Sequence, residues 1–408
     1  MAGPNGYHLI SSRGDASDVL RVLLDGSEWT RADLAQNLSL SRSTISTRID
    51  ALRQAGLIRD ASRVEPRGGR PQTKIALNER ALTVAAIELG HKSGRVTIGD
   101  LAARPIDRVS FPLDTADSVE QTLRSASARL RGLLSGPGSE AGPLAGVTLG
   151  LPFWTALGAM NTRERAAHWL SFPVEKWLGD KLDAEVFIAN DVNLMTLGEQ
   201  MEQHPNVRDL MFLYAGDGIG LGIVASGELV RGSNDQAGEI THLPVPRDTD
   251  EICECGLTGC LGAVATLPRL AARLRADGVE VANSEDLPVL AASGNAQAGQ
   301  LLRQAGRDAG DVLAYLIAAT NPSLLVVGGE AVSAGDHYLT GVKEALFRRG
   351  APPLTKDLHV VRSASSPDSG TVGALRLAAE QVLNSDRLFR LLAGDAGPDN
   401  GNAVGNSR

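Results

Sequence analysis

Cysteine is scarce in this chain, and long apolar runs are missing. Only three of the 408 residues are cysteines. No segment approaches the roughly 18 to 20 uncharged apolar residues that a membrane-spanning helix needs. The N-terminus also lacks the apolar stretch and cleavage site of a secretory signal. We therefore expect a cytoplasmic protein with no membrane partner, in a compartment that keeps thiols reduced.

The three cysteines are clustered, and a histidine precedes them. Cys253, Cys255 and Cys260 fall within eight residues, and His242 stands eleven residues before the first. Three thiolates and one imidazole form the donor set of a closed tetrahedral Zn²⁺ site, so we predict a structural metal. Two alternatives remain open. They are a disulfide with one cysteine left over, which the odd count disfavours, and three unrelated buried thiols, which the clustering disfavours.

Charge is distributed unevenly along the chain. The net charge is −8, from 40 basic and 48 acidic side chains. Residues 1–80 carry 12 basic and 9 acidic side chains, so the remainder carries 28 and 39. Residues 42–74 alone hold eight basic and three acidic side chains. Such a local excess is the electrostatic footprint of a surface that contacts phosphate backbones.

Three short helical patterns occur within this basic region. Apolar residues at helical spacing predict a first helix over residues 15–24. Thr30 and Asp33 predict a capping box for a second helix. Ser41 is expected to cap a third helix that stops at Gly56. Three helices with a tight turn before the third predict a helix-turn-helix.

The third helix has the composition of a recognition helix. Its predicted outer face offers short hydroxyls and guanidiniums that can reach base edges and phosphates, namely Arg42, Ser43, Thr44, Ser46, Thr47 and Arg48. The alternative is a solvated polar face on an ordinary helical bundle. The next segment favours DNA binding, because two predicted strands flank a tip that carries Arg67 and Arg70 between glycines and prolines. A hairpin at this place is a wing, and arginines at its tip suit a narrow minor groove.

Beyond residue 80 the pattern changes to a long α/β region. Buried strands are predicted at residues 82–89, 95–101 with a turn at Gly99-Asp100, 146–151 and 188–191, and a helix at 118–134. A strand-turn-strand at 210–224, a helix at 298–320 and a following strand indicate a second lobe. We expect a multidomain protein with a two-lobed actin/hexokinase-like α/β fold. The predicted domains are a flexible arm (1–12), a winged helix-turn-helix (13–80), an effector domain (81–392) and a disordered tail (393–408). Within the effector domain we expect a small lobe at about 81–192 with a C-terminal helix at about 371–392, and a large lobe at about 193–370 with a zinc loop at 242–260.

The stretch from Gln236 to Gly262 resembles the signature of the ROK family, named for its repressors, open reading frames and sugar kinases. That signature, Glu-x-Gly-His followed by Cys-x-Cys-Gly-x-x-Gly-Cys-Leu-Glu, implies a zinc site beside a sugar pocket. Two positions depart from it. Thr241 replaces a glycine, and Gly262 replaces a glutamate that binds sugar in the family. Residues 13–80 also resemble the winged domain of ROK repressors.

The resemblance further implies an effector site in this chain. Residues 188–193, Ile-Ala-Asn-Asp-Val-Asn, are similar to the family motif whose asparagine and aspartate bind sugar hydroxyls. By this resemblance Asn190, Asp191, Glu239 and His242 would contact the effector, and Asp191 would be the base if the protein were a kinase. A strand-end Asx turn at Asn190 and Asp191 is the alternative. Phe153 stands where the family usually has glycine and would intrude on the pocket.

The two phosphate-binding turns of the family's kinases are altered here. Kinases carry Asp-x-Gly-Gly-Thr-Lys in the first turn, where this chain has Glu88, His91 and Lys92. They carry Gly-Thr-Gly in the second, where this chain has Asp217 between two glycines. A carboxylate there would face the phosphates, and like charges at close range repel. We therefore expect no ATP-dependent phosphotransfer, although Gly328 and Gly329 of the adenosine region persist.

Together these patterns predict a transcriptional regulator, most simply a repressor, of carbohydrate-related genes. It would bind double-stranded operator DNA and sense a sugar or sugar phosphate without phosphorylating it. Dimers read symmetric operators, so a homodimer or homotetramer is expected. Two rival functions remain: a bifunctional sugar kinase that also binds DNA, and a DNA-binding protein whose C-terminal domain only oligomerises.

Overall fold

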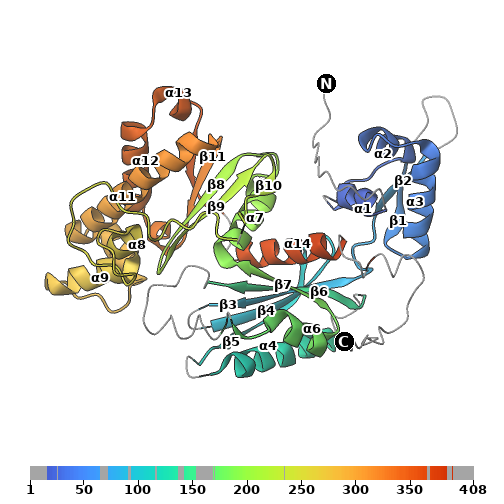
Figure 1. Cartoon of the computed structure of the whole chain (residues 1–408), viewed down its shortest axis with the longest axis horizontal. Helices are drawn as coiled ribbons and strands as arrows, with labels where there is room; N and C mark the ends of the chain where they lie inside the picture. Colours follow the sequence, from blue (N-terminus) through green and yellow to red (C-terminus); the bar gives the residue numbers. More distant parts are fainter. Residues whose placement is uncertain are drawn as a thin grey trace, which may run out of the picture.

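The computed structural model describes residues 16–24, 26–64, 72–90, 93–114, 117–136, 142–152, 169, 171–233, 235–364, 368–383 and 388. These residues form an N-terminal domain and two lobes, each lobe built on its own five-stranded sheet (Figure 1). The arm predicted for residues 1–12 and the tail predicted for residues 393–408 lie outside the described residues.

The N-terminal domain consists of three short helices and a β-hairpin. These elements are α1 (Ser17–Leu23), α2 (Arg31–Asn37), α3 (Arg42–Gln54), β1 (Ile58–Val64) and β2 (Gln72–Leu77). The predicted capping box is present, because Thr30 and Asp33 exchange hydrogen bonds at the start of α2. Ser41 caps α3 by accepting the backbone N–H of Thr44. Local side-chain chemistry therefore sets both helix starts.

One face of α3 forms the core of this domain. Ile45, Ile49 and Leu52 are completely buried. Beside its two strands the hairpin has one further backbone pairing: Trp29 and Ile75 of β2 exchange two backbone hydrogen bonds of 3.0 and 2.8 Å. The segment between α1 and α2 therefore fastens the hairpin along β2. The outer face of α3 is exposed to solvent.

The small lobe is a mixed sheet with strand order β5-β4-β3-β6-β7. Its strands are β3 (Thr83–Leu89), β4 (Ser93–Asp100), β5 (Pro105–Pro112), β6 (Leu144–Leu151) and β7 (Glu185–Asn190). Helices α4 (Val119–Leu134) and α6 (Val174–Leu182) cover one face, and α14 (Ser369–Leu383) covers the other (Figure 1). Side chains of β3 are buried on both faces, as its continuous apolar run requires: Ala85 and Ile87 pack with α4, and Val84 and Ala86 pack with α14.

The turn predicted at Gly99-Asp100 was placed too early. Both residues belong to β4, and the chain reverses over the next residues, where Ala103 has a positive φ of 60°. Asp100 Oδ1 accepts the backbone N–H groups of Ala102 and Arg104. The aspartate therefore closes the turn from its first position, as Asx turns do.

The large lobe has a second sheet with strand order β10-β9-β8-β11-β12. Its strands are β8 (Leu210–Ala215), β9 (Ile219–Ala225), β10 (Glu228–Leu229), β11 (Leu324–Gly328) and β12 (His359–Arg362). Its helices are α8 (Leu261–Ala265), α9 (Leu267–Ala276), α10 (Asp286–Ala292), α11 (Ala296–Thr320), η1 (Glu330–Val332), α12 (His337–Arg349) and α13 (Pro352–Thr355). The strands and the long helix predicted for this region are all present.

Two helices join the three parts of the molecule. Helix α7 (Asp191–Gln203) follows β7 of the small lobe, packs on β9 of the large lobe and lies against α14 (Figure 1). The two helices touch at their backbones, because a Cβ atom added at Gly198 would overlap Ser369 and one at Gly373 would overlap Leu194. Helix α14 also reaches the N-terminal domain, where Arg376 Nη1 donates to the carbonyl of Leu24 at 3.3 Å.

Candidate functional site

The outer face of α3 presents most of the predicted DNA-contacting side chains to solvent. Arg42, Ser43 and Thr47 are exposed, and Thr44 and Ser46 are half-buried. The hydroxyls of this face already bond to one another and to the helix. Ser41 Oγ lies 2.8 Å from both Ser43 Oγ and Thr44 Oγ1, and Thr47 Oγ1 donates to the carbonyl of Ser43 at 3.1 Å.

Arg48 does not lie on this outer face, which corrects the sequence-based assignment. It is buried, and its Nη1 lies 3.6 Å from Asp18 Oδ2 of α1. The helical period explains the difference: Arg48 follows the fully buried Ile45 by three residues, which places it over the same face. The two wing arginines, Arg67 and Arg70, lie outside the described residues.

The four predicted metal ligands meet in the large lobe. One donor atom from each of His242, Cys253, Cys255 and Cys260 lies within 4.8 Å of every other. Cys253 Sγ is 3.4 Å from His242 Nδ1, and Cys255 Sγ is 3.6 Å from Cys260 Sγ. A tetrahedral ion with bonds of about 2.0 to 2.3 Å holds its ligand atoms roughly 3.3 to 3.8 Å apart. The donor set and its spacing therefore fit a zinc-type ion.

Two glycines shape the loop that carries the thiols. Gly256 and Gly259 adopt positive φ angles of 91° and 76°, which a side chain would disfavour. The loop closes through backbone hydrogen bonds from Cys253 to Leu257 and from Gly256 to Cys253, both 2.8 Å. The Cys-x-Cys-Gly-x-x-Gly-Cys spacing thus folds the sulfurs onto one point.

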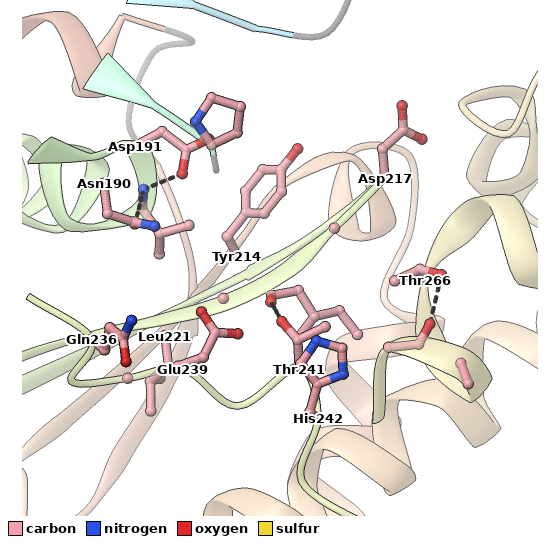
Figure 2. A pocket seen from close by; sticks show the side chains of 18 of the residues that line it. Asn190, Asp191, Tyr214, Asp217, Leu221, Gln236, Glu239, Thr241, His242 and Thr266 are labelled. Carbon is pink, nitrogen blue, oxygen red and sulfur yellow. Dashed lines mark hydrogen bonds between the residues drawn. The ribbon is translucent and has the colours of Figure 1, made fainter. Parts of the chain in front are cut away.

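A cavity of about 340 Å³ lies next to this cluster. It is lined by Asn190 and Asp191 where the small lobe passes into α7, and by the β8-β9 turn and the segment from Asp235 to His242 of the large lobe. Figure 2 shows Asp191, Tyr214, Glu239 and His242 around this space. All four predicted effector residues therefore line one pocket, and His242 also belongs to the group of four possible metal ligands.

Asn190 and Asp191 are held at the start of α7. Asn190 Oδ1 accepts the backbone N–H groups of Val192 and Asn193 at 2.9 and 3.2 Å, so the asparagine is the helix cap. A strand-end Asx turn was the alternative to effector binding for Asn190 and Asp191. The turn is present, and its acceptor is the side-chain oxygen of Asn190. Burial raises the pKa of Asp191 to about 7, and the negative charges of Glu88 and Glu239 act in the same direction. The carboxyl of Asp191 is thus poised between its neutral and charged forms near neutral pH.

Glu239 is positioned by the glycine before it. Gly238 has a φ of 87°, and a Cβ there would overlap the carbonyl of Leu221 on β9. This close approach turns the next side chain into the cavity, where the buried Glu239 Oε1 has no hydrogen-bond partner among the described residues. Burial raises the pKa of Glu239, although hydrogen bonds from Thr241 oppose the shift. An unpaired buried carboxylate oxygen is an acceptor ready for a ligand hydroxyl.

Two of the residues that alter the kinase phosphate turns, Glu88 and Asp217, make internal contacts here. Glu88 accepts a hydrogen bond from Thr371 of α14, and burial raises its pKa. Asp217 accepts a hydrogen bond from Ser284 at 2.8 Å. Three residues that the sequence also singled out in this region, His91, Lys92 and Phe153, lie outside the described residues.

Sequence reasoning missed Tyr214 and Glu330. Tyr214 Oη donates to Glu330 Oε2 at 2.8 Å, and a Cβ added at Gly216 would overlap that same carboxylate oxygen. Burial, together with the charge of Glu330, raises the pKa of Tyr214, so its hydroxyl stays protonated as a donor. The sequence offered one indication of Glu330: it directly follows Gly328 and Gly329, where β11 ends.

Two family models match this chain. The ROK family model matches residues 84–381, and a winged helix-turn-helix DNA-binding model matches residues 17–59. The chain belongs to the ROK family. Its N-terminal winged helix-turn-helix and its actin/hexokinase-like α/β domain are thereby confirmed, as is the family predicted from the cysteine motif.

Named ROK relatives include both regulators and kinases. The xylose repressor of Caldicellulosiruptor bescii is 23% identical over 400 residues, covering 93% of this chain and 98% of the repressor. A glucokinase of Halalkalibacterium halodurans is 27% identical over 318 residues, covering 72% of this chain and 94% of the enzyme. The solved structure of a ROK family transcriptional regulator, a homolog of the E. coli MLC protein, has the same fold over 93% of this chain and 98% of its own, with a TM-score of 0.76 at 20% identity. The repressors thus match across the winged domain, whereas the glucokinase spans a shorter share of this chain.

Proposed function

We propose that this ROK protein is a DNA-binding repressor of carbohydrate-related genes. Its winged domain, residues 13–80 by our assignment, would bind double-stranded operator DNA, and its effector domain, residues 81–392, would sense a sugar. The single observation that carries this proposal is the joining of an exposed helix-turn-helix face to a kinase-like domain whose ligand pocket is kept. Relatives named as repressors match this chain over nearly their whole length.

DNA binding is supported by the position and chemistry of α3. Its exposed residues, with Arg42 at their head, face away from the rest of the chain, and the hairpin β1-β2 stands beside it. Direct readout needs such short polar and guanidinium groups on a free helix face. Operators read by a helix-turn-helix are commonly symmetric, and we infer a homodimer or homotetramer in the DNA complex.

Sugar sensing is supported by the cavity between the lobes. Asp191, Glu239 and Asn190 offer carboxylate oxygens and an amide at its wall, the groups that hydroxyl-rich ligands bind. A ligand that touches both lobes stabilises one arrangement of them, and can shift that equilibrium only by its difference in affinity. Sensing without phosphotransfer is favoured because the second phosphate turn is occupied by the Glu330 side chain.

The metal cluster has a structural role in this proposal. His242, Cys253, Cys255 and Cys260 would hold one Zn²⁺ with no open position. Bound there, the ion would fasten the cysteine loop to the segment that carries Glu239 and His242. These residues form one wall of the pocket, so the metal would keep that wall in place.

The test uses the full-length protein and the DNA next to its own gene. Footprinting should reveal a protected, symmetric segment, and a panel of neutral sugars and sugar phosphates should contain a member that changes operator affinity. If no panel member binds, the oligomerising function of the C-terminal domain gains support. A second candidate, a bifunctional sugar kinase, is favoured by the likeness to the glucokinase. Coupled measurement of ADP formation with the same sugars decides it, and turnover would overturn the non-enzymatic assignment.

A further inference from the structure

The turn between β8 and β9 has one open side and one filled side. At Gly218 an added Cβ would meet nothing within 4 Å, and this residue lines the cavity. At Gly216 the same atom would overlap Glu330 Oε2 and lie 2.7 Å from Tyr214 Oη. The Gly216 N–H is already used, since it donates to the carbonyl of Gly218 at 2.9 Å. The turn therefore offers a ligand neither space nor a free donor at Gly216.

The backbone at Gly329, directly after β11, holds Glu330 in this position. Gly329 has a φ of 90°, and a Cβ there would overlap the carbonyl of Ala215. This approach brings the residue after Gly329 directly against the β8-β9 turn. Tyr214 then fixes the carboxylate through its 2.8 Å hydrogen bond. The close contact of Gly329 thus fixes the backbone of Glu330, and the phenol of Tyr214 fixes its carboxylate.

Other charges around the cavity are also unfavourable for an anion. Among the described residues that line it, five carry carboxylates and one carries a guanidinium. That guanidinium, Arg269, lies 3.4 Å from Glu254. Figure 2 shows Tyr214 between Asp191 and Asp217, and the negative charges of both carboxylates help to raise the pKa of Tyr214. A phosphate placed between α7 and the β8-β9 turn would therefore face carboxylates on each side.

We propose that Glu330 is a built-in anion that occupies the phosphate position of the β8-β9 turn and restricts the pocket to ligands without a phosphate group. The inference rests on the proposed function, because it names the ligand class of the same pocket. Glu330 lies behind Tyr214, which lines the cavity, and it excludes phosphate by filling the space at Gly216 and by its charge, while Tyr214 positions it. The effector class is then an uncharged polyhydroxylated molecule, and sugar phosphates and nucleotides are excluded.

Binding calorimetry on the full-length protein distinguishes the effect of the size of the Glu330 side chain from the effect of its charge. Glu330→Ala removes both, whereas Glu330→Gln keeps the size and loses the charge. Glu120→Gln is the matched control, since it removes an exposed carboxylate from the first turn of α4, outside the cavity. The probes are inorganic phosphate, AMP-PNP with Mg²⁺, glucose with glucose 6-phosphate, and N-acetylglucosamine with its 6-phosphate.

Wild-type protein and the Glu120→Gln control should bind no phosphate-bearing probe more tightly than its neutral counterpart. Glu330→Ala should gain at least tenfold in affinity for inorganic phosphate or for a sugar phosphate, with neutral-sugar affinity unchanged. Glu330→Gln should gain less, and it carries the test if Glu330→Ala fails to fold. The inference is overturned if wild-type protein prefers a sugar phosphate, or if neither Glu330 variant gains affinity for any anion. Failure of every neutral sugar to bind would count against sensing itself, while the phosphate titration would still decide the role of Glu330.

Discussion

Thr241 and Gly262 occupy complementary volumes in the wall beside the pocket. A Cβ atom at Gly262 would lie 2.6 Å from Thr241 Cγ2 and 3.2 Å from the Thr241 carbonyl. That carbonyl accepts the Gly262 N–H at 2.8 Å, and Thr241 Oγ1 donates to the carbonyl of Ile219 at 2.7 Å. The two departures from the ROK signature are therefore one coupled change: the threonine methyl fills the space that a side chain at 262 would need.

The coupling predicts strongly non-additive mutations. Gly262→Glu alone should destabilise the protein by about 1 to 3 kcal/mol, because it overpacks against Thr241. Thr241→Gly should also cost about 1 kcal/mol, through the lost hydrogen bond to Ile219. The double variant should be more stable than the sum of the two losses predicts. Urea denaturation of all four proteins gives the interaction free energy, and strict additivity would show that the two sites do not compete for space.

Loss of a metal ligand should release the ion and loosen the pocket wall. Purified protein should contain about one zinc per chain, and Cys255→Ser should contain none. Its melting temperature should fall by several degrees, because metal binding and folding of this loop are linked. Glu254→Gln alters the same loop without removing a ligand and should keep the metal. Metal analysis and thermal unfolding provide both readouts, and wild-type protein without zinc would contradict the assignment.

Arginines of the third helix should differ in what they contribute. Arg42→Ala should weaken operator binding and lower the slope of log affinity against log salt by roughly one, the loss of one phosphate contact. Arg70→Ala should do the same from the wing, or should weaken binding in proportion to A·T content if it enters the minor groove.

Arg48→Ala should instead lower stability, since it removes a buried side chain and the ion pair that this side chain makes with Asp18, which also pairs with Arg21. Circular dichroism melts and fluorescence anisotropy at several salt concentrations distinguish the two effects. Arg124→Ala on the exposed side of α4 is the control and should change neither. A well-folded Arg48→Ala protein with weakened, less salt-dependent binding would place this residue on the DNA after all.

Asp191 predicts a pH-dependent stability. Its pKa of about 7 lies above the ordinary value for aspartate, so the folded protein binds the proton more tightly than the unfolded chain. The contribution of the neutral carboxyl to the free energy of unfolding is therefore complete below about pH 4 and is lost as pH rises through 7. Asp191→Asn, which stays neutral, should gain stability over wild type across that window, by at most about 4 kcal/mol. Denaturation at pH 4.5 and pH 8 measures the gain, and an equal difference at both values would contradict it.

The same aspartate tests sensing. Asp191→Asn keeps the helix start but replaces an acceptor oxygen with an amide, so a sugar that depends on it should bind more weakly. Operator affinity in the absence of sugar should stay unchanged, because α3 is far from α7 in the fold (Figure 1). Fluorescence anisotropy with and without sugar checks both. Altered sugar-free DNA binding would indicate that Asp191 acts on the fold and not on the ligand.

Features set by neighbouring residues could be predicted from the sequence, and features set by distant contacts could not. Thr30 with Asp33 and Ser41 with Thr44 act within one helical turn, so both helix starts were evident. The meeting of His242 with the three cysteines could be predicted because the cysteines fall within eight residues and the histidine shortly precedes them. Arg48 was misplaced although its spacing of three residues from Ile45 was a local signal that put it over the buried face. Glu330 was missed because it meets Tyr214, 116 residues earlier in the chain, only after β11 pairs with β8.

Helix α14 gives the two ends of the polypeptide a shared interface. Arg376 contacts Leu24 across 352 residues, and buried side chains of the winged domain, the small-lobe sheet and α14 form one continuous cluster. A ribosome adds roughly 5 to 20 residues per second, so about 20 to 70 seconds separate the synthesis of these two partners. During that interval the apolar side chains of the earlier elements that will pack against α14 remain uncovered on the nascent chain. The surface of the winged domain that packs with α14 is therefore covered last although its residues are made first, and a chain cut short before residue 369 would leave that apolar surface exposed.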